Sequence, residues 1–131
     1  MIGVDTNMLL RLFVPVEPQR AASMAFFGQR SAEDPAYVSL IVLAEFAWVL
    51  KRRYKYSFEQ IGQGIRWILD SDDFMVEDRS RVEWALANYT RQRIDFSDLL
   101  IARSSESAGA SSTVTFDRDA AKHVPGMELL K

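Results

Sequence analysis

Short apolar runs alternate along this chain with longer segments that have the 3.6-residue periodicity of helices. This alternation is typical of βαβ units, in which helices connect parallel strands. We expect strands at residues 2–5, 36–40, 72–78, 111–116 and 127–130. We expect helices at residues 6–13, 17–31, 41–54, 57–69, 80–92, 95–109 and 117–122. The predicted fold class is α/β: a three-layer sandwich with a mainly parallel sheet of four to five strands, flanked by helices.

The length and composition predict one globular domain. At 131 residues the chain is long enough to bury a core, and we expect a single domain over residues 1–131. Hydrophobic residues make up 48% and charged residues 26%, which is ordinary for a folded protein. The longest apolar run contains Glu45 and is too short to span a bilayer. With no secretory leader at its start, the chain is expected to be cytoplasmic, without a membrane partner.

The residue inventory excludes several kinds of chemistry. The chain has no cysteine, so disulfides, thiolate metal sites and cysteine nucleophiles are excluded. Its one histidine, His123, disfavours a zinc site, a catalytic histidine pair and a Ser–His–Asp triad, and we expect it at the surface. The formal net charge of −2 decides nothing about a nucleic-acid partner. The basic stretches at residues 51–55 and 91–93 are interpreted as solvated helix ends, with a nucleic-acid contact surface as the alternative.

Four carboxylates lie beside apolar runs, at or near the ends of predicted elements: Asp5, Glu45, Asp98 and Asp117. Each of them alone could cap a helix, interact favourably with the helix dipole, or simply face water. Because the carboxyl ends of parallel strands meet at one edge of a sheet, Asp5 and Asp117 are expected to lie close together. Crowded carboxylates repel unless a cation compensates them. Oxygen ligands suit Mg²⁺, or alternatively Mn²⁺.

A carboxylate-held metal without a cofactor motif indicates phosphate chemistry. The only glycine-rich candidate, "GQGIR" at residues 62–66, lacks the lysine of a P-loop and falls within a predicted helix. The metal would therefore have to orient the phosphate and lower the pKa of a bound water.

Four segments resemble the conserved blocks of PIN-domain ribonucleases, and within them the VapC toxins: "VDTNMLLRL", the acid inside "VLAEFAWVL", "DFSDLLIA" and "TVTFDRDA". The resemblance runs from Ile2 to about Ala121. It implies a PIN-like fold and carries the family's four acids to Asp5, Glu45, Asp98 and Asp117. In the D-x-x-D block the catalytic acid aligns with Asp98, which leaves Asp95 as support. The resemblance leaves open the roles of four neighbouring polar residues: Thr6, Asn7, Thr115 and Asp119.

The resemblance also implies an activity and partners. The chain would be an Mg²⁺-dependent endoribonuclease in which a metal-activated water attacks an RNA phosphodiester, leaving a 5′-phosphate and a 3′-hydroxyl. Asp5 and Asp98 would be the most direct metal ligands, while Glu45 and Asp117 would hold metal waters or a second ion. The protein would form a homodimer and bind a VapB-type antitoxin whose C-terminal tail covers the site. The RNA target and the cleavage sequence stay open.

Three other functions are alternatives to the ribonuclease. A receiver-like domain, which accepts a phosphoryl group on aspartate, is disfavoured because Thr6 and Asn7 follow Asp5 and Lys122 comes late. An aspartyl phosphatase is expected to carry a D-x-D motif after the first strand, which "DTN" does not supply. A PIN-like scaffold that only binds protein is expected to have lost one or more acids. The retained alternative is a PIN-like or receiver-like acidic-pocket domain that acts mainly through protein binding or phosphoryl transfer.

Overall fold

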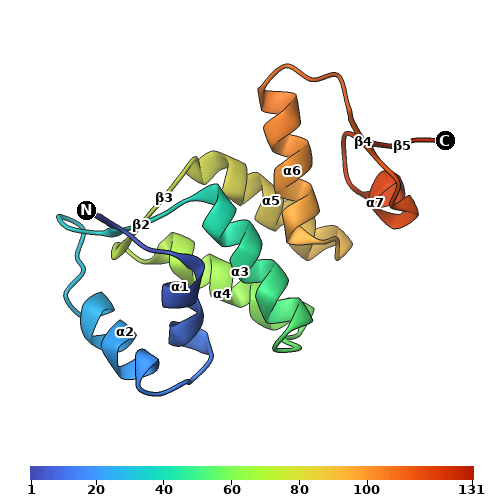
Figure 1. Ribbon diagram of the computed structural model, residues 1–131. Coiled ribbons are helices and arrows are strands. Elements are labelled where there is room, and N and C mark those ends of the chain that lie inside the picture. The colour runs from blue at the N-terminus through green and yellow to red at the C-terminus, as the bar shows by residue number, and fades with distance from the viewer. The chain divides into compact units, whose positions relative to one another are not determined.

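The computed structural model describes residues 1–131 and contains seven helices and five strands (Figure 1). The strands are β1 (Ile2–Gly3), β2 (Ala36–Val38), β3 (Phe74–Val76), β4 (Thr113–Thr115) and β5 (Met127–Leu129). The helices are α1 (Thr6–Phe13), α2 (Gln19–Phe27), α3 (Leu40–Arg52), α4 (Phe58–Asp70), α5 (Arg79–Gln92), α6 (Phe96–Ser107) and α7 (Arg118–His123). The chain divides into two compact units, Met1–Arg79 and Ser80–Lys131. Each unit is described by itself below.

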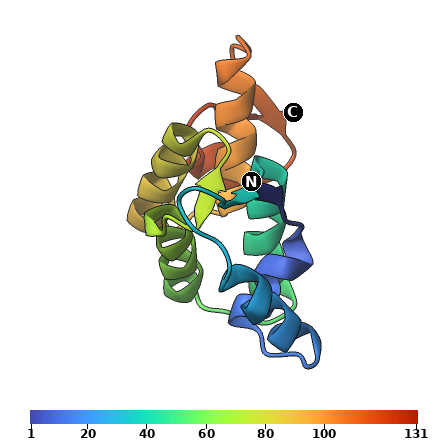
Figure 2. The same cartoon turned by 90° about the vertical axis from the view of Figure 1, so that its left-hand side faces the viewer.

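The first unit contains a parallel sheet in the order β1-β2-β3, with Ile2 in register with Ala36, and Ala36 with Phe74. Helices α1 and α2 connect β1 to β2, and α3 and α4 connect β2 to β3, as in βαβ units. Helix α1 packs against α2 and α3 (Figure 2). Fully buried aliphatic and aromatic side chains form the core of this unit: Leu9, Leu43, Phe46, Leu50, Ile61, Ile65 and Ile68.

Local capping explains where the helices of the first unit begin. Asp5, Ser39 and Ser57 are the N-caps of α1, α3 and α4, and each side chain accepts a hydrogen bond from a backbone N–H of the first turn. Ser57 and Gln60 form a capping box in which both hydrogen bonds are present. The bounds predicted for α1 are confirmed, whereas α2 is shorter than the predicted helix at residues 17–31.

The second unit contains helices α5 and α6, followed by β4, α7 and β5. Strands β4 and β5 pair in parallel, with Thr113 in register with Met127. Gly109 follows α6 with a φ of +99°, a left-handed conformation that glycine commonly adopts beyond a helix end. Asp117 is the N-cap of the short helix α7.

The structure confirms the α/β class, because all the strand pairings within the two sheets are parallel. The five strands are divided between a three-stranded and a two-stranded sheet, whereas the sequence analysis placed them in one. Strand pairing joins segments that are far apart in the sequence, so local patterns predict the strands but not which of them share a sheet. None of the helices is both long enough and apolar enough to cross a membrane.

Candidate active site

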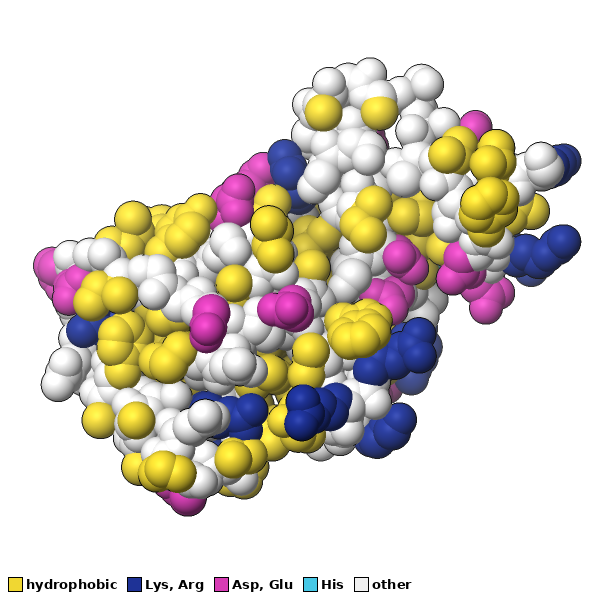
Figure 3. Space-filling model, viewed as in Figure 1, with side chains coloured by type: hydrophobic (Ala, Val, Ile, Leu, Met, Phe, Trp, Pro, Cys, Tyr) yellow, Lys and Arg dark blue, Asp and Glu magenta, His cyan; other side chains and the backbone are white.

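A pocket of about 200 Å³ opens on the first unit, between the start of α1 and the face of α3. Four of its residues come from the N-cap of α1 and from α1 itself: Asp5, Thr6, Asn7 and Leu10. The other four come from α3 and the residues that follow it: Glu45, Val49, Arg53 and Tyr54. We call this the α1–α3 pocket. In the space-filling view, acidic side chains lie over the upper part of these helices and basic side chains lie below them (Figure 3).

One end of the α1–α3 pocket is acidic, because it carries the carboxylates of Asp5 and Glu45. Asp5 uses one carboxylate oxygen to cap α1, accepting a hydrogen bond from the Met8 N–H at 3.1 Å. Thr6 is buried and its hydroxyl donates a hydrogen bond to Oε1 of Glu45. Asp5 is therefore a helix cap and a pocket residue at once, and Glu45 is held toward the pocket by the first residue of α1.

The donor set at the acidic end fits a hard divalent cation. It consists of two carboxylates together with the side-chain oxygens of Thr6 and Asn7, and it contains no sulfur and no imidazole. Mg²⁺ and Mn²⁺ prefer such oxygen ligands, and Mg²⁺ usually keeps several of its waters. Asp5 and Glu45 are exposed, so a hydrated ion can reach both carboxylates.

The other end of the α1–α3 pocket is basic, because Arg53 lines it. The guanidinium carbon of Arg53 lies 5.6 Å from the centre of the Tyr54 ring. Behind Tyr54, the buried Arg11 directs its Nη2 at the tyrosine hydroxyl, 3.5 Å away. The hydrogen bond from Arg11 is the largest cause that lowers the pKa of Tyr54 below its usual value.

Two sequence signals pointed toward this basic end. Arg53 belongs to the basic stretch at residues 51–55, which was interpreted as a solvated helix end; the structure instead places Arg53 on the pocket. Arg11 is the one charge inside the apolar helix segment "MLLRLF", four residues after Asn7. Residues four apart lie on the same helix face, so this spacing already placed Arg11 on the side of α1 that carries Asn7.

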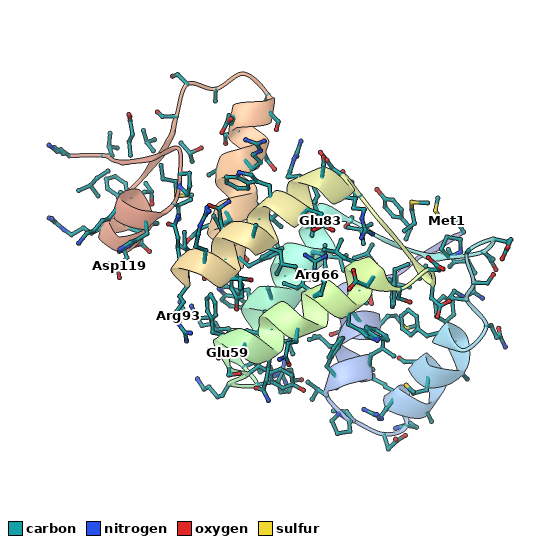
Figure 4. All side chains as sticks on the ribbon, turned by 180° about the vertical axis from the view of Figure 1, so that it is seen from behind. Met1, Glu59, Arg66, Glu83, Arg93 and Asp119 are labelled. Atoms are coloured by element: carbon teal, nitrogen blue, oxygen red, sulfur yellow. The ribbon has the colours of Figure 1, made fainter.

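The other two predicted acids belong to the second unit. Asp98 lies half-buried in the first turn of α6, and Asp95 caps that helix by accepting the Ser97 N–H at 2.9 Å. Asp117 follows β4, and its side chain accepts the Ala120 N–H at 3.0 Å. Asp119 lies on α7 beside it (Figure 4). The structure thus brings Asp5 and Glu45 to one pocket, and the convergence of all four acids on one metal stays a prediction.

The expected position of the histidine can be compared with the structure. His123 is exposed, as expected, and its Nδ1 lies 3.1 Å from the backbone oxygen of Asp119. In the first unit, the ring of Trp67 makes edge contacts with Phe13 and Phe74.

Comparison with known proteins gave two matches that cover nearly the whole chain. The sequence profile of the PIN domain family matches residues 2–126. A VapC ribonuclease of Aquifex aeolicus (strain VF5) is 26% identical over 116 residues, which cover 88% of this chain and 86% of that protein. Both matches confirm the resemblance that was drawn from the four acidic segments.

Proposed function

Because the chain belongs to the PIN domain family, we propose that it is an Mg²⁺-dependent endoribonuclease and the toxin of a type II toxin–antitoxin pair. The observation that carries the proposal is the α1–α3 pocket, where Asp5 and Glu45 share one end and Thr6 holds Glu45 in place. The similarity to a VapC ribonuclease supports RNA as the substrate.

The residues of the pocket support a metal-assisted hydrolysis. When bound, the cation would polarise the scissile phosphate and make its water acidic enough to act as the nucleophile. Asp5 would be a direct ligand, and its cap to the Met8 N–H fixes the carboxylate at the helix start. Glu45 would hold a metal water or a second ion, with Thr6 orienting its carboxylate. We assign Asp98 a direct ligand role and Asp117 the same supporting role as Glu45.

The partners belong to the proposal as well. Besides RNA, we propose a VapB-type antitoxin, a homodimer and a cytoplasmic location, with Mn²⁺ as a substitute for Mg²⁺. These assignments rest on the similarity to VapC-type proteins. Purification together with the neighbouring gene product would test the antitoxin, and light scattering of the purified chain would test the dimer.

The first experiment removes the metal. The purified full-length chain is incubated with total cellular RNA in Mg²⁺, in Mn²⁺ and in EDTA, and the products are separated on a denaturing gel. We expect discrete fragments with 5′-phosphates in either metal and none in EDTA, because without the cation nothing polarises the scissile phosphate or lowers the pKa of the attacking water. Sequencing of the fragment ends would then identify the target.

Two outcomes would contradict the proposal. Cleavage that persists in EDTA would refute metal dependence. If a folded, antitoxin-free sample cleaves no RNA in any condition, the retained alternative, a PIN-like domain that acts through protein binding, becomes the better explanation.

Thr6→Val tests whether Glu45 must be oriented. Valine matches the shape of threonine but cannot donate the hydrogen bond to Glu45, and position 6 is buried. We expect RNA cleavage to fall by about 10- to 100-fold, as for other residues that orient metal ligands. The measurement is the cleavage rate as a function of Mg²⁺ concentration, with a thermal melt of each variant.

A matched control is Thr90→Val, since the hydroxyl of Thr90 donates only to the backbone oxygen of Leu86 in α5. This control is expected to cleave at the parent rate. If Thr6→Val also keeps the parent rate and the parent Mg²⁺ dependence, Glu45 needs no orienting partner and this part of the site is wrong.

A further inference from the structure

The α1–α3 pocket has ends of opposite charge. Its acidic end carries Asp5 and Glu45, and its basic end carries Arg53 and Tyr54. Eight residues separate Glu45 from Arg53, which at 1.5 Å per residue is about 12 Å along α3. A ligand that reaches from one end to the other must therefore bind both the metal cation proposed at the two carboxylates and the guanidinium of Arg53.

The buried Arg11 adds a second positive charge to the basic end, beside that of the exposed Arg53. Its side chain is only 8% exposed, and neither Nε nor Nη1 has a hydrogen-bond acceptor. Nη2 has a single partner, the hydroxyl of Tyr54. A guanidinium stays charged in proteins, and burying a charge without a counter-ion is costly. An anion bound close to Arg11 would offset that cost.

Tyr54 and Arg53 connect this buried charge with the pocket. The Tyr54 hydroxyl accepts the hydrogen bond from Arg11, so its own proton is available for a ligand oxygen. Arg53 lies over the face of the Tyr54 ring, and no carboxylate of the chain pairs with its guanidinium. A guanidinium binds phosphate oxygens through two parallel N–H groups.

We propose that Arg53 and Tyr54 form a subsite for an RNA phosphate that neighbours the scissile one, with Arg11 as a buried positioning residue behind Tyr54. A phosphodiester strand suits both ends, since it can place one phosphate at the metal and another at the guanidinium. A peptide carboxylate would suit only the basic end. The proposal rests on the proposed function in so far as the acidic end holds the scissile phosphate.

The test measures RNA binding separately from cleavage. A fluorescein-labelled, short single-stranded RNA of mixed sequence is titrated with the full-length chain in EDTA, and its anisotropy gives the binding constant at several salt concentrations. A gel confirms that the probe stays intact. The variants are Arg53→Gln and Tyr54→Phe. The control is Arg52→Gln, because Arg52 is the exposed neighbour that lies over Trp48 and does not line the pocket.

Each variant has its own expected result. For Arg53→Gln we expect binding that is weaker by about 3- to 10-fold and a slope of log K against log salt that is less negative by about 0.7, the value for one phosphate of a single strand. For Tyr54→Phe we expect weaker binding with an unchanged slope, since no charge is lost. The control is expected to keep the parent slope.

Arg11 is tested by a double-mutant cycle. Arg11→Met is expected to weaken RNA binding in the parent chain and to have a smaller effect once Tyr54→Phe is present, because Arg11 acts through that hydroxyl. A merely structural role would add the same loss in both backgrounds.

A fluorescein-labelled, glutamate-rich peptide is titrated in the same way as a second probe. Three results would overturn the subsite: equal slopes for the Arg53 and Arg52 variants, unaltered RNA binding in both pocket variants, or weaker binding of the peptide probe alone. The last result would assign the basic end to a protein partner. Failure of the ribonuclease proposal is distinguishable, because it would abolish cleavage while the probe still bound with the parent slope.

Discussion

Asp5→Asn is expected to abolish metal-dependent RNA cleavage while the protein stays folded, a larger loss than the roughly 10- to 100-fold typical of residues that only orient a metal ligand. Asparagine keeps an oxygen that can accept the Met8 N–H, so the cap of α1 survives the change. It removes the negative charge that a divalent cation needs. The melting temperature is expected to stay equal or to rise, because a carboxylate near Glu45 is removed.

Comparison with Asp5→Ala separates the two roles of this residue. Alanine removes both the ligand and the cap, so we expect the same loss of cleavage together with a loss of about 1 kcal/mol in the free energy of unfolding. Cleavage rates on a gel and thermal melts would be measured for both variants. Asp72→Asn is the charge control, because Asp72 is exposed and lies outside the pocket.

The same change at Asp98 extends the test to the second unit. Asp98→Asn is expected to abolish cleavage as Asp5→Asn does, since both are proposed as direct metal ligands. If only Asp5→Asn is inactive, the four acids do not act on one metal. Normal cleavage by both variants would mean that the site is misassigned.

Arg11→Met is expected to stabilise the protein, although it weakens RNA binding. Methionine has a similar length and no charge, so the change removes the buried guanidinium whose Nε and Nη1 have no acceptor. Replacing buried charged groups by apolar ones has stabilised other proteins by about 1–4 kcal/mol. The Tyr54 hydroxyl loses its donor but is only half-buried, so water can take the place of Arg11.

Thermal and urea unfolding would measure this effect. For a chain of this size each kcal/mol raises Tm by roughly 3 °C. Arg52→Met is the matched control, since Arg52 is exposed and its loss is expected to change stability by less than about 0.5 kcal/mol. A fall in stability for Arg11→Met would show that the guanidinium is well compensated in the fold, and the argument for a nearby anion would lose its basis.

The order and type of the elements were predictable because their signals are local. The bounds of α1, the capping box of Ser57 and Gln60, and the glycine after α6 all depend on residues within one helical turn of one another. The same holds for the positions of Asp5 and Asp117. Each follows a strand and caps the next helix, and both facts can be derived from the residues on either side.

The contacts that make the pocket were not predictable in this way. Thr6 meets Glu45 across 39 positions of the chain, and Arg11 meets Tyr54 across 43. The stretch that contains Arg53 therefore had the pattern of an ordinary solvated helix end, and no role for Arg11 was predicted. The division of the strands into two sheets has the same origin, since strand pairing depends on segments far apart in sequence.

The sequence by itself determined the α/β class and the family, because residue types and short-range spacing carry that information. It also predicts the four acids and a site with oxygen ligands alone, which stay predictions. Only the tertiary structure decided that Asp5 and Glu45 share a pocket, that Thr6 orients Glu45, and that a buried arginine stands behind Tyr54 at the opposite end. The packing of α1 against α3 creates these relations. No local pattern in either helix specifies which side chains of the other it will meet.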